Sequence, residues 1–214
     1  MGKITVVGTG PGAKEFLTPA AQTAIADAEI ICGATRLLCT FADDHRQQLP
    51  IDKDLPAVIE KLREIYKQKR VVVLVSGDTG LFSFAQYLTK HFRREELEFI
   101  PGISSVQVMF ARLQQSWADV RIISMHGRTE QGIYEIIKQT PVTAMVTGNP
   151  WTPQGIAEFL LTQDRTLTNW SVVIGKNLTY DDEQIVETSL GQLRNQQNDY
   201  SNSVMVIYND TDKK

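Results

Sequence analysis

Short runs of apolar, mostly β-branched residues recur along the chain, and most end at a glycine or a small polar residue. The runs lie at residues 4–7, 29–32, 71–75, 99–100, 120–124, 142–146, 172–174 and 204–208. In the strongest of them apolar residues follow one another without alternating with polar ones, so we expect strands that are buried on both faces. The pattern predicts sheets in which most strands run parallel.

Between these runs lie segments with helical signals. Residues 55–69 and 81–92 carry apolar side chains at helical spacing. Thr18-Pro19 and Thr152-Pro153 each place a capping hydroxyl before a proline at the first helical position. Strands that alternate with helices predict an α/β protein.

A polar stretch at residues 112–119 follows the fourth strand–helix unit. It predicts two α/β domains, at residues 1–115 and 116–214, each close to the usual size of a domain.

The composition is that of an ordinary globular protein. The chain has 214 residues, 42% of them hydrophobic and 22% charged, with a net charge of −3. This balance argues against a disordered chain and against a general nucleic-acid binder. No apolar stretch suits a membrane span or a signal peptide, and there are only two cysteines. We therefore expect a cytoplasmic protein that does not enter a membrane.

The first loop, residues 8–13, reads GTGPGA and matches the dinucleotide pattern G-x-G-x-x-G/A literally. That pattern requires a helix to begin directly after the loop, whereas the helix signal here comes at Thr18-Pro19. The second predicted strand also ends at Gly33-Ala34 and lacks the expected acid. We therefore expect either a tight turn or a backbone that a ligand approaches closely.

Two further loops follow predicted strands. In SGDTG, residues 76–80, Asp78 lies where open α/β sheets bind ligands, or else caps a helix near Leu81. In PGISS, residues 101–105, the serine hydroxyls either cap the next helix or bind an anionic group.

A fourth loop contains His126 and Arg128, which suit recognition of a carboxylate or form a surface turn. No pair of histidines has metal-ligand spacing and no C-x-x-C occurs, so we expect no metal bound by the protein. Phosphate-loop and nucleophile-elbow motifs are also missing. These residues alone indicate a ligand site at strand ends and name no reaction.

Taken in order, these loops resemble the tetrapyrrole methylase family. The pattern V-G-x-G-P-G followed by L-T is met at residues 7–12 and 17–18, S-G-D at 76–78 and P-G-x-S at 101–104. Within the family the chain is most similar to methylases that act on carbon 5 of a corrinoid in cobalamin biosynthesis. The segments that carry this closer similarity are residues 33–38, 101–107, 111–113, 117, 124–128 and 177–185.

The resemblance implies two α/β domains with a cofactor cleft between them, usually in a homodimer. It implies S-adenosylmethionine as the methyl donor, S-adenosylhomocysteine as its product, and cobalt-precorrin-7 or precorrin-6Y as the corrinoid acceptor. A separate protein that modifies carbon 15 is then a possible partner, and neither nucleic acid nor membrane is expected.

By position, the resemblance also assigns the site residues. It assigns contact with the donor to Pro11, Gly77, Asp78, Leu81, Ser104, Ser105, Thr147, Asn177 and Ser203. Substrate carboxylates are assigned to Arg36, His126 and Arg128, and His126 is also considered as a base that removes a proton.

Three alternatives stay open at this point. The same fold also serves other acceptors, such as another precorrin, a modified histidine or a ribose of ribosomal RNA; an RNA acceptor predicts a basic face. A non-catalytic corrinoid- or nucleoside-binding module is favoured only by Thr79, which stands where the family usually has proline. A nicotinamide-dependent oxidoreductase rests on residues 8–13 alone.

Overall fold

The chain folds into two units, residues 1–104 and 105–214. The computed structural model describes residues 2–43, 45–125 and 132–209. The boundary lies earlier than the expected one after residue 115, because helix α5 (Ser105–Leu113) packs on strands β7 (Val142–Val146) and β10 (Ser203–Tyr208) of the second unit.

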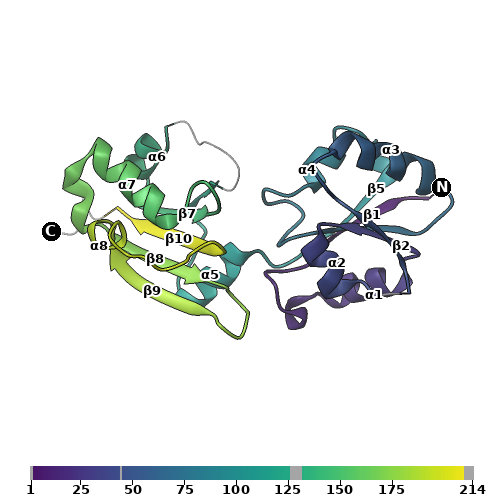
Figure 1. Ribbon diagram of the computed structural model, residues 1–214, viewed down its shortest axis with the longest axis horizontal. Coiled ribbons are helices and arrows are strands. Elements are labelled where there is room, and N and C mark those ends of the chain that lie inside the picture. Colours follow the sequence, from purple (N-terminus) through teal and green to yellow (C-terminus); the bar gives the residue numbers. More distant parts are fainter. Residues whose placement is uncertain (1, 44, 126–131, 210–214) are drawn as a thin grey trace. The chain divides into compact units, whose positions relative to one another are not determined.

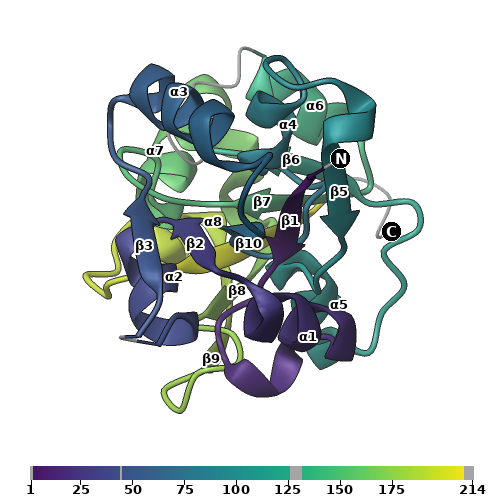
Figure 2. The ribbon, with the colours of Figure 1, turned by 90° about the vertical axis from the view of Figure 1, so that its right-hand side faces the viewer.

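The first unit is a parallel sheet covered by helices on both faces. Its strands, in the spatial order β3-β2-β4-β1-β5, are Gln47–Pro50, Ile30–Gly33, Val71–Val75, Ile4–Gly8 and Leu97–Ile100. Neighbouring strands are parallel throughout. Figure 2 shows β3, β2, β1 and β5 in this order.

The pleat of β4 explains why its apolar run is continuous. Val71, Val73 and Val75 pack with helices α3 (Leu55–Ile65) and α4 (Ala85–Leu88). Val72 and Leu74 pack on the other face with α1 (Pro19–Asp27) and α2 (Thr35–Phe41). Because successive side chains point to opposite faces, a strand between two helical layers needs an apolar residue at every position. Figure 1 shows the two layers of this unit.

The second unit is built on a mixed sheet with the spatial order β6-β7-β10-β8-β9. Besides β7 and β10 it contains β6 (Arg121–Ser124), β8 (Ser171–Lys176) and β9 (Gln184–Ser189). Only the pair β6 and β7 is parallel, and β10 runs antiparallel to both of its neighbours. The prediction of an α/β fold is confirmed. The prediction of mostly parallel strands is right for the first sheet and wrong for the second, since apolar runs show burial and not direction.

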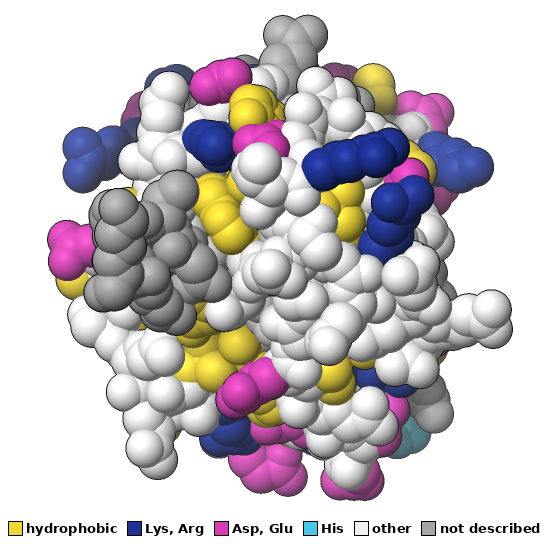
Figure 3. All heavy atoms as spheres, turned by 90° about the vertical axis from the view of Figure 1, so that its left-hand side faces the viewer, with side chains coloured by type: hydrophobic (Ala, Val, Ile, Leu, Met, Phe, Trp, Pro, Cys, Tyr) yellow, Lys and Arg dark blue, Asp and Glu magenta, His cyan; other side chains and the backbone are white. Residues whose placement is uncertain are grey.

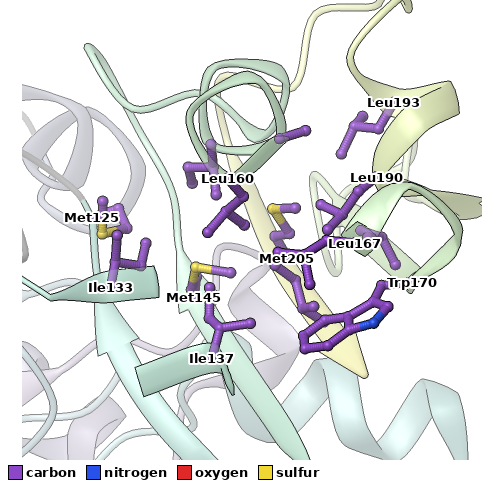
Figure 4. Close-up of a cluster of buried hydrophobic side chains, with 14 of the residues drawn as sticks. Met125, Ile133, Ile137, Met145, Leu160, Leu167, Trp170, Leu190, Leu193 and Met205 are labelled. Atoms are coloured by element: carbon purple, nitrogen blue, oxygen red, sulfur yellow. The ribbon is translucent and has the colours of Figure 1, made fainter. Parts of the chain in front are cut away.

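One face of the second sheet packs on α6 (Ile133–Gln139), α7 (Pro153–Gln163) and α8 (Leu190–Leu193). Figure 4 shows this core, in which Met145 and Met205 of the sheet meet Leu160, Leu190 and Trp170. Flexible methionines fill such irregular spaces well.

The two helix starts predicted from a capping threonine are confirmed. The side chains of Thr18 and Thr152 accept hydrogen bonds from the backbone N–H groups of Ala21 and Gly155, as predicted. The helix expected over residues 81–92 is reduced to α4, which begins without a side-chain cap. Short 3-10 helices lie at Lys14–Phe16, Arg94–Glu96 and Arg165–Asn169. Among the described residues, no helix combines the length and the apolar character that crossing a bilayer requires.

Candidate functional site

Three loops of the first unit meet at the carboxyl edge of its sheet. Strands β4, β1 and β5 are neighbours, so the loops that follow them lie side by side. Ligands bind at this edge in open α/β sheets. Five predicted donor residues fall on these loops: Pro11, Gly77, Asp78, Leu81 and Ser104. Ser105 is the first residue of α5 and belongs to the second unit.

Glycines allow the three loops to touch backbone to backbone. Gly10 and Gly77 exchange two hydrogen bonds, at 3.2 and 2.9 Å, and their φ angles of 78° and 67° lie in the region that favours glycine. A Cβ on Gly102 would lie 2.3 Å from the carbonyl oxygen of Gly77 and 2.7 Å from the carbonyl carbon of Gly8. Such distances exclude any side chain at position 102.

The Asp78 carboxylate joins two of these loops. Its Oδ1 accepts a hydrogen bond from the N–H of Gly80 at 2.8 Å, and its Oδ2 accepts one from the N–H of Gly102 at 3.1 Å. No helix begins at Leu81, so the alternative that Asp78 caps a helix there is wrong. The carboxylate instead accepts from one N–H group of its own loop and from one of the loop after β5, and these two hydrogen bonds fix the shape of the SGD loop.

At the same edge, few described atoms lie close to the backbone of Gly77. Among the described atoms, a Cβ built on Gly77 would meet only the Cα of Ser104, at 3.7 Å. Thr79, by contrast, is buried, so the residue that departs from the family pattern faces the protein. The loop therefore fits a group that lies closely along Gly77 and Asp78, as the predicted donor would.

Arg36 lies beside this edge. It belongs to α2, directly after β2, and its Nη2 donates a hydrogen bond to the Ser76 hydroxyl at 3.1 Å. The side chain is exposed, as a guanidinium that recognises a carboxylate needs to be. Its role toward the substrate stays a prediction. His126 and Arg128 lie outside the described residues.

In the second unit the structure brings Thr147 and Ser203 together. They follow β7 and begin β10, both are buried, and their hydroxyl oxygens lie 2.7 Å apart. The Ser203 hydroxyl also donates to the carbonyl of Tyr200 at 2.7 Å. These hydroxyls stabilise the edge of the second sheet, and their contact with a donor stays a prediction.

Asn177 follows β8 at the same edge. Its Nδ2 donates to Asp182 Oδ2 at 2.7 Å, and its Oδ1 accepts from Asn202 Nδ2 at 3.0 Å. The φ angle of Asn177 is 46°. Both ends of the side chain thus hold the loop, and contact between Asn177 and a donor also stays a prediction.

The sequence analysis gave no role to Arg112 and Glu183, which form an ion pair next to this loop. Arg112 Nε lies 2.6 Å from Glu183 Oε1, and Nη2 lies 3.2 Å from Oε2. The hydrogen bonds from Arg112 lower the pKa of Glu183, although desolvation opposes the shift. Both residues lie in segments that carry the family resemblance, but 71 positions apart, and no local signal pairs them.

Solved structures share this fold over nearly the whole chain. A precorrin-6Y methylase of cobalamin biosynthesis from Archaeoglobus fulgidus superposes with a TM-score of 0.74 at 23% identity, over 96% of this chain and 97% of that one. A uroporphyrin-III C-methyltransferase from Thermus thermophilus, solved with S-adenosyl homocysteine, gives a TM-score of 0.78 at 17% identity, over 97% of each chain. These likenesses show the tetrapyrrole methylase fold.

Sequence comparison then shows the family. The profile of the Tetrapyrrole (Corrin/Porphyrin) Methylases matches residues 3–194, and the chain belongs to this family. A probable cobalt-precorrin-7 C(5)-methyltransferase of Methanocaldococcus jannaschii is 30% identical over 210 residues, 96% of this chain and 97% of that protein. The cobalt-precorrin-7 C(5)-methyltransferase of Salmonella typhimurium is 32% identical over 182 residues, 85% of this chain and 88% of that protein.

Proposed function

We propose that this tetrapyrrole methyltransferase transfers a methyl group from S-adenosylmethionine to carbon 5 of cobalt-precorrin-7 or of precorrin-6Y. The observation that carries the proposal is the similarity over nearly the whole chain to a probable C(5)-methyltransferase. The glycine-built edge of the first unit supports the donor part, because it leaves the backbone at Gly77 open to a ligand.

The chain's part in this reaction is to bind and to orient. When bound, the donor supplies a methyl group already activated on a sulfonium sulfur, so the hard chemistry comes with it. The SGD loop would fix the donor, and correct orientation of the two reactants contributes up to about 7–11 kcal/mol. Arg36, with His126 and Arg128, would bind the carboxylates of the acceptor. His126 is the proposed base for the proton that leaves the methylated ring.

A corrinoid acceptor agrees better than RNA with the net charge and with the one face drawn in Figure 3. The net charge is −3, and the face in Figure 3 carries acidic and basic side chains close together. RNA binding favours a continuous basic face. The homodimer and the separate protein for carbon 15 stay predictions, which sedimentation velocity of the chain alone and with that partner would test.

Donor binding is the first test. Calorimetric titration with S-adenosylhomocysteine should show binding by the wild type and weaker binding by Asp78→Asn. The amide nitrogen of asparagine replaces one carboxylate oxygen and cannot accept, so the N–H of either Gly80 or Gly102 loses its partner. Glu98→Gln, which neutralises an exposed carboxylate of the same unit, is the matched control and should bind normally. A folded wild-type protein that does not bind the probe contradicts the proposal.

Turnover then tests the acceptor. With labelled S-adenosylmethionine and cobalt-precorrin-7, the label should appear as one methyl group on carbon 5, as located by NMR. Methylation at another carbon would keep the donor and replace the acceptor.

A further inference from the structure

The loop between β8 and β9, residues 177–183, has a conformation that ordinary residues avoid. Asn177 and Thr179 have φ angles of 46° and 74°. Asparagine tolerates the left-handed region, whereas a β-branched threonine there is a true outlier. Such residues persist only where their surroundings over-determine them, and they gather at functional sites. The observation raises the question of what holds this loop.

Glu183 holds the loop through a direct contact with Thr179. Its Oε2 accepts a hydrogen bond from the backbone N–H of Thr179 at 2.6 Å. The same carboxylate receives Nε and Nη2 of Arg112 from α5, at 2.6 and 3.2 Å. A two-point contact fixes the orientation of the carboxylate as well as its position. Arg112 therefore sets the loop through Glu183.

The remaining contacts tie the loop to the edge of the sheet. Asn177 hydrogen-bonds to Asp182 and Asn202 through its side chain, and its N–H donates to the carbonyl of Asn202 at 3.0 Å. Leu178 is buried in the unit. Because Asn202 precedes Ser203, the loop is fixed beside the pair formed by Ser203 and Thr147.

Stability alone does not explain this arrangement. The side chain of Arg112 is 41% exposed and that of Glu183 20% exposed. Ion pairs that are this accessible to water usually contribute little to stability. What the Arg112–Glu183 pair adds is geometry, because Glu183 must accept from Thr179 and from Arg112 at once.

We propose that Arg112 and Glu183 are positioning residues that hold the 177–183 loop in the conformation in which it contacts the methyl donor. The inference rests on the proposed function for the identity of the ligand. The holding of the loop itself rests on the contacts above.

The test compares two ion pairs of the same unit. Arg112→Met removes the guanidinium and keeps the apolar stem. Arg194→Met does the same to the ion pair of Arg194 with Glu158, which joins α8 to α7. Arg112→Met should bind S-adenosylhomocysteine about tenfold more weakly, which equals about 1.4 kcal/mol. Arg194→Met should bind as the wild type does. Both variants should melt at similar temperatures, so that a difference in affinity does not reflect a difference in stability.

A charge exchange separates geometry from simple attraction. In the double variant Arg112→Glu, Glu183→Arg the two charges still attract, but an arginine at 183 cannot accept from the N–H of Thr179. The proposal expects no recovery of affinity, whereas Arg112→Lys should recover part of it. Recovery in the exchanged variant, or unchanged affinity of Arg112→Met, overturns the proposal.

Hydrogen exchange at the Thr179 amide tests the holding of the loop without any ligand. Arg112→Met should speed this exchange, and unchanged exchange overturns the positioning role whether or not a donor binds. If the wild type does not bind S-adenosylhomocysteine, the proposed function fails and the donor contact fails with it. The amide exchange then still decides whether Arg112 positions the loop.

Discussion

In the first unit three strand-end loops touch backbone to backbone, whereas in the second unit the edge with Thr147, Asn177 and Ser203 is held by side chains. Gly8 and Gly102 leave no space for a Cβ where the loops meet, and the carbonyl oxygen of Gly77 is among the atoms that either Cβ would strike. At the other edge, hydroxyl, amide and carboxylate groups make the contacts.

The difference teaches how each edge responds to substitution. Contacts between backbones cannot relax by changing a rotamer, so an added atom has to move a loop. Contacts between side chains are lost one at a time, with a graded cost for each hydrogen bond. We therefore expect the first edge to fail abruptly and the second to weaken in steps.

The largest expected effect comes from Gly102→Ala. Its Cβ would clash with backbone atoms of both neighbouring loops, and we expect a loss of about 3 kcal/mol, the upper end for overpacking. Binding of S-adenosylhomocysteine should be abolished. Urea unfolding and calorimetric titration measure the two effects.

The matched control is Gly155→Ala in α7, where the nearest atom is the Thr152 hydroxyl oxygen at 3.4 Å. Alanine favours a helix by about 0.5–1 kcal/mol over glycine, so this variant should be neutral or slightly more stable. Equal effects of the two substitutions would contradict the picture of a backbone-held edge.

Thr147→Val should have an intermediate effect. The substitution keeps the shape of the side chain and removes both contacts of the Thr147 hydroxyl with the buried Ser203, to its hydroxyl oxygen at 2.7 Å and to its carbonyl oxygen at 2.9 Å. We expect a loss of about 1–2 kcal/mol in the free energy of unfolding. Thr162→Val, which removes an exposed hydroxyl bonded to the carbonyl of Phe159, should stay within about 0.5 kcal/mol. A Thr147 variant as stable as this control would contradict a side-chain-held edge.

The smallest expected effect is on acid unfolding. Each unit contains a carboxyl group whose pKa is lowered in the folded state. In the first unit, Arg93 and Tyr66 hydrogen-bond to Glu96 and lower its pKa to about 2. In the second unit, Thr166, Lys138 and Tyr134 lower the pKa of Asp164. Both carboxyls therefore stabilise the fold above their unfolded pKa, and this stabilisation is lost as the pH falls toward their folded values.

Two signals separate the two carboxyls. All three tryptophans, at positions 117, 151 and 170, lie in the second unit. When unfolding is followed by tryptophan fluorescence, the free energy of unfolding of Asp164→Asn should depend less on pH between about 5 and 2 than that of the wild type. When unfolding is followed by circular dichroism, Glu96→Gln should show the same weaker dependence. If neither variant changes either profile, the two carboxyls do not stabilise the fold through these contacts.

Much of the first unit could be predicted because its signals are local. Val71–Val75 needs apolar residues at every position, and Thr18-Pro19 caps its own helix. Strand β3, which reads QQLP, escaped prediction because it is polar and lies at the edge of the sheet. Strand β9 also escaped prediction, because it lies at the edge of its sheet and combines an exposed isoleucine with polar neighbours.

The sequence by itself determined the alternation of strands and helices, the three glycine loops and, through their order, the resemblance to the family. Each of these depends on residues close together along the chain. Only the tertiary structure decided that β10 lies antiparallel between β7 and β8, that Asp78 binds Gly102, and that Arg112 meets Glu183. These contacts join residues far apart in the sequence, and the folding of the whole unit brings such residues together.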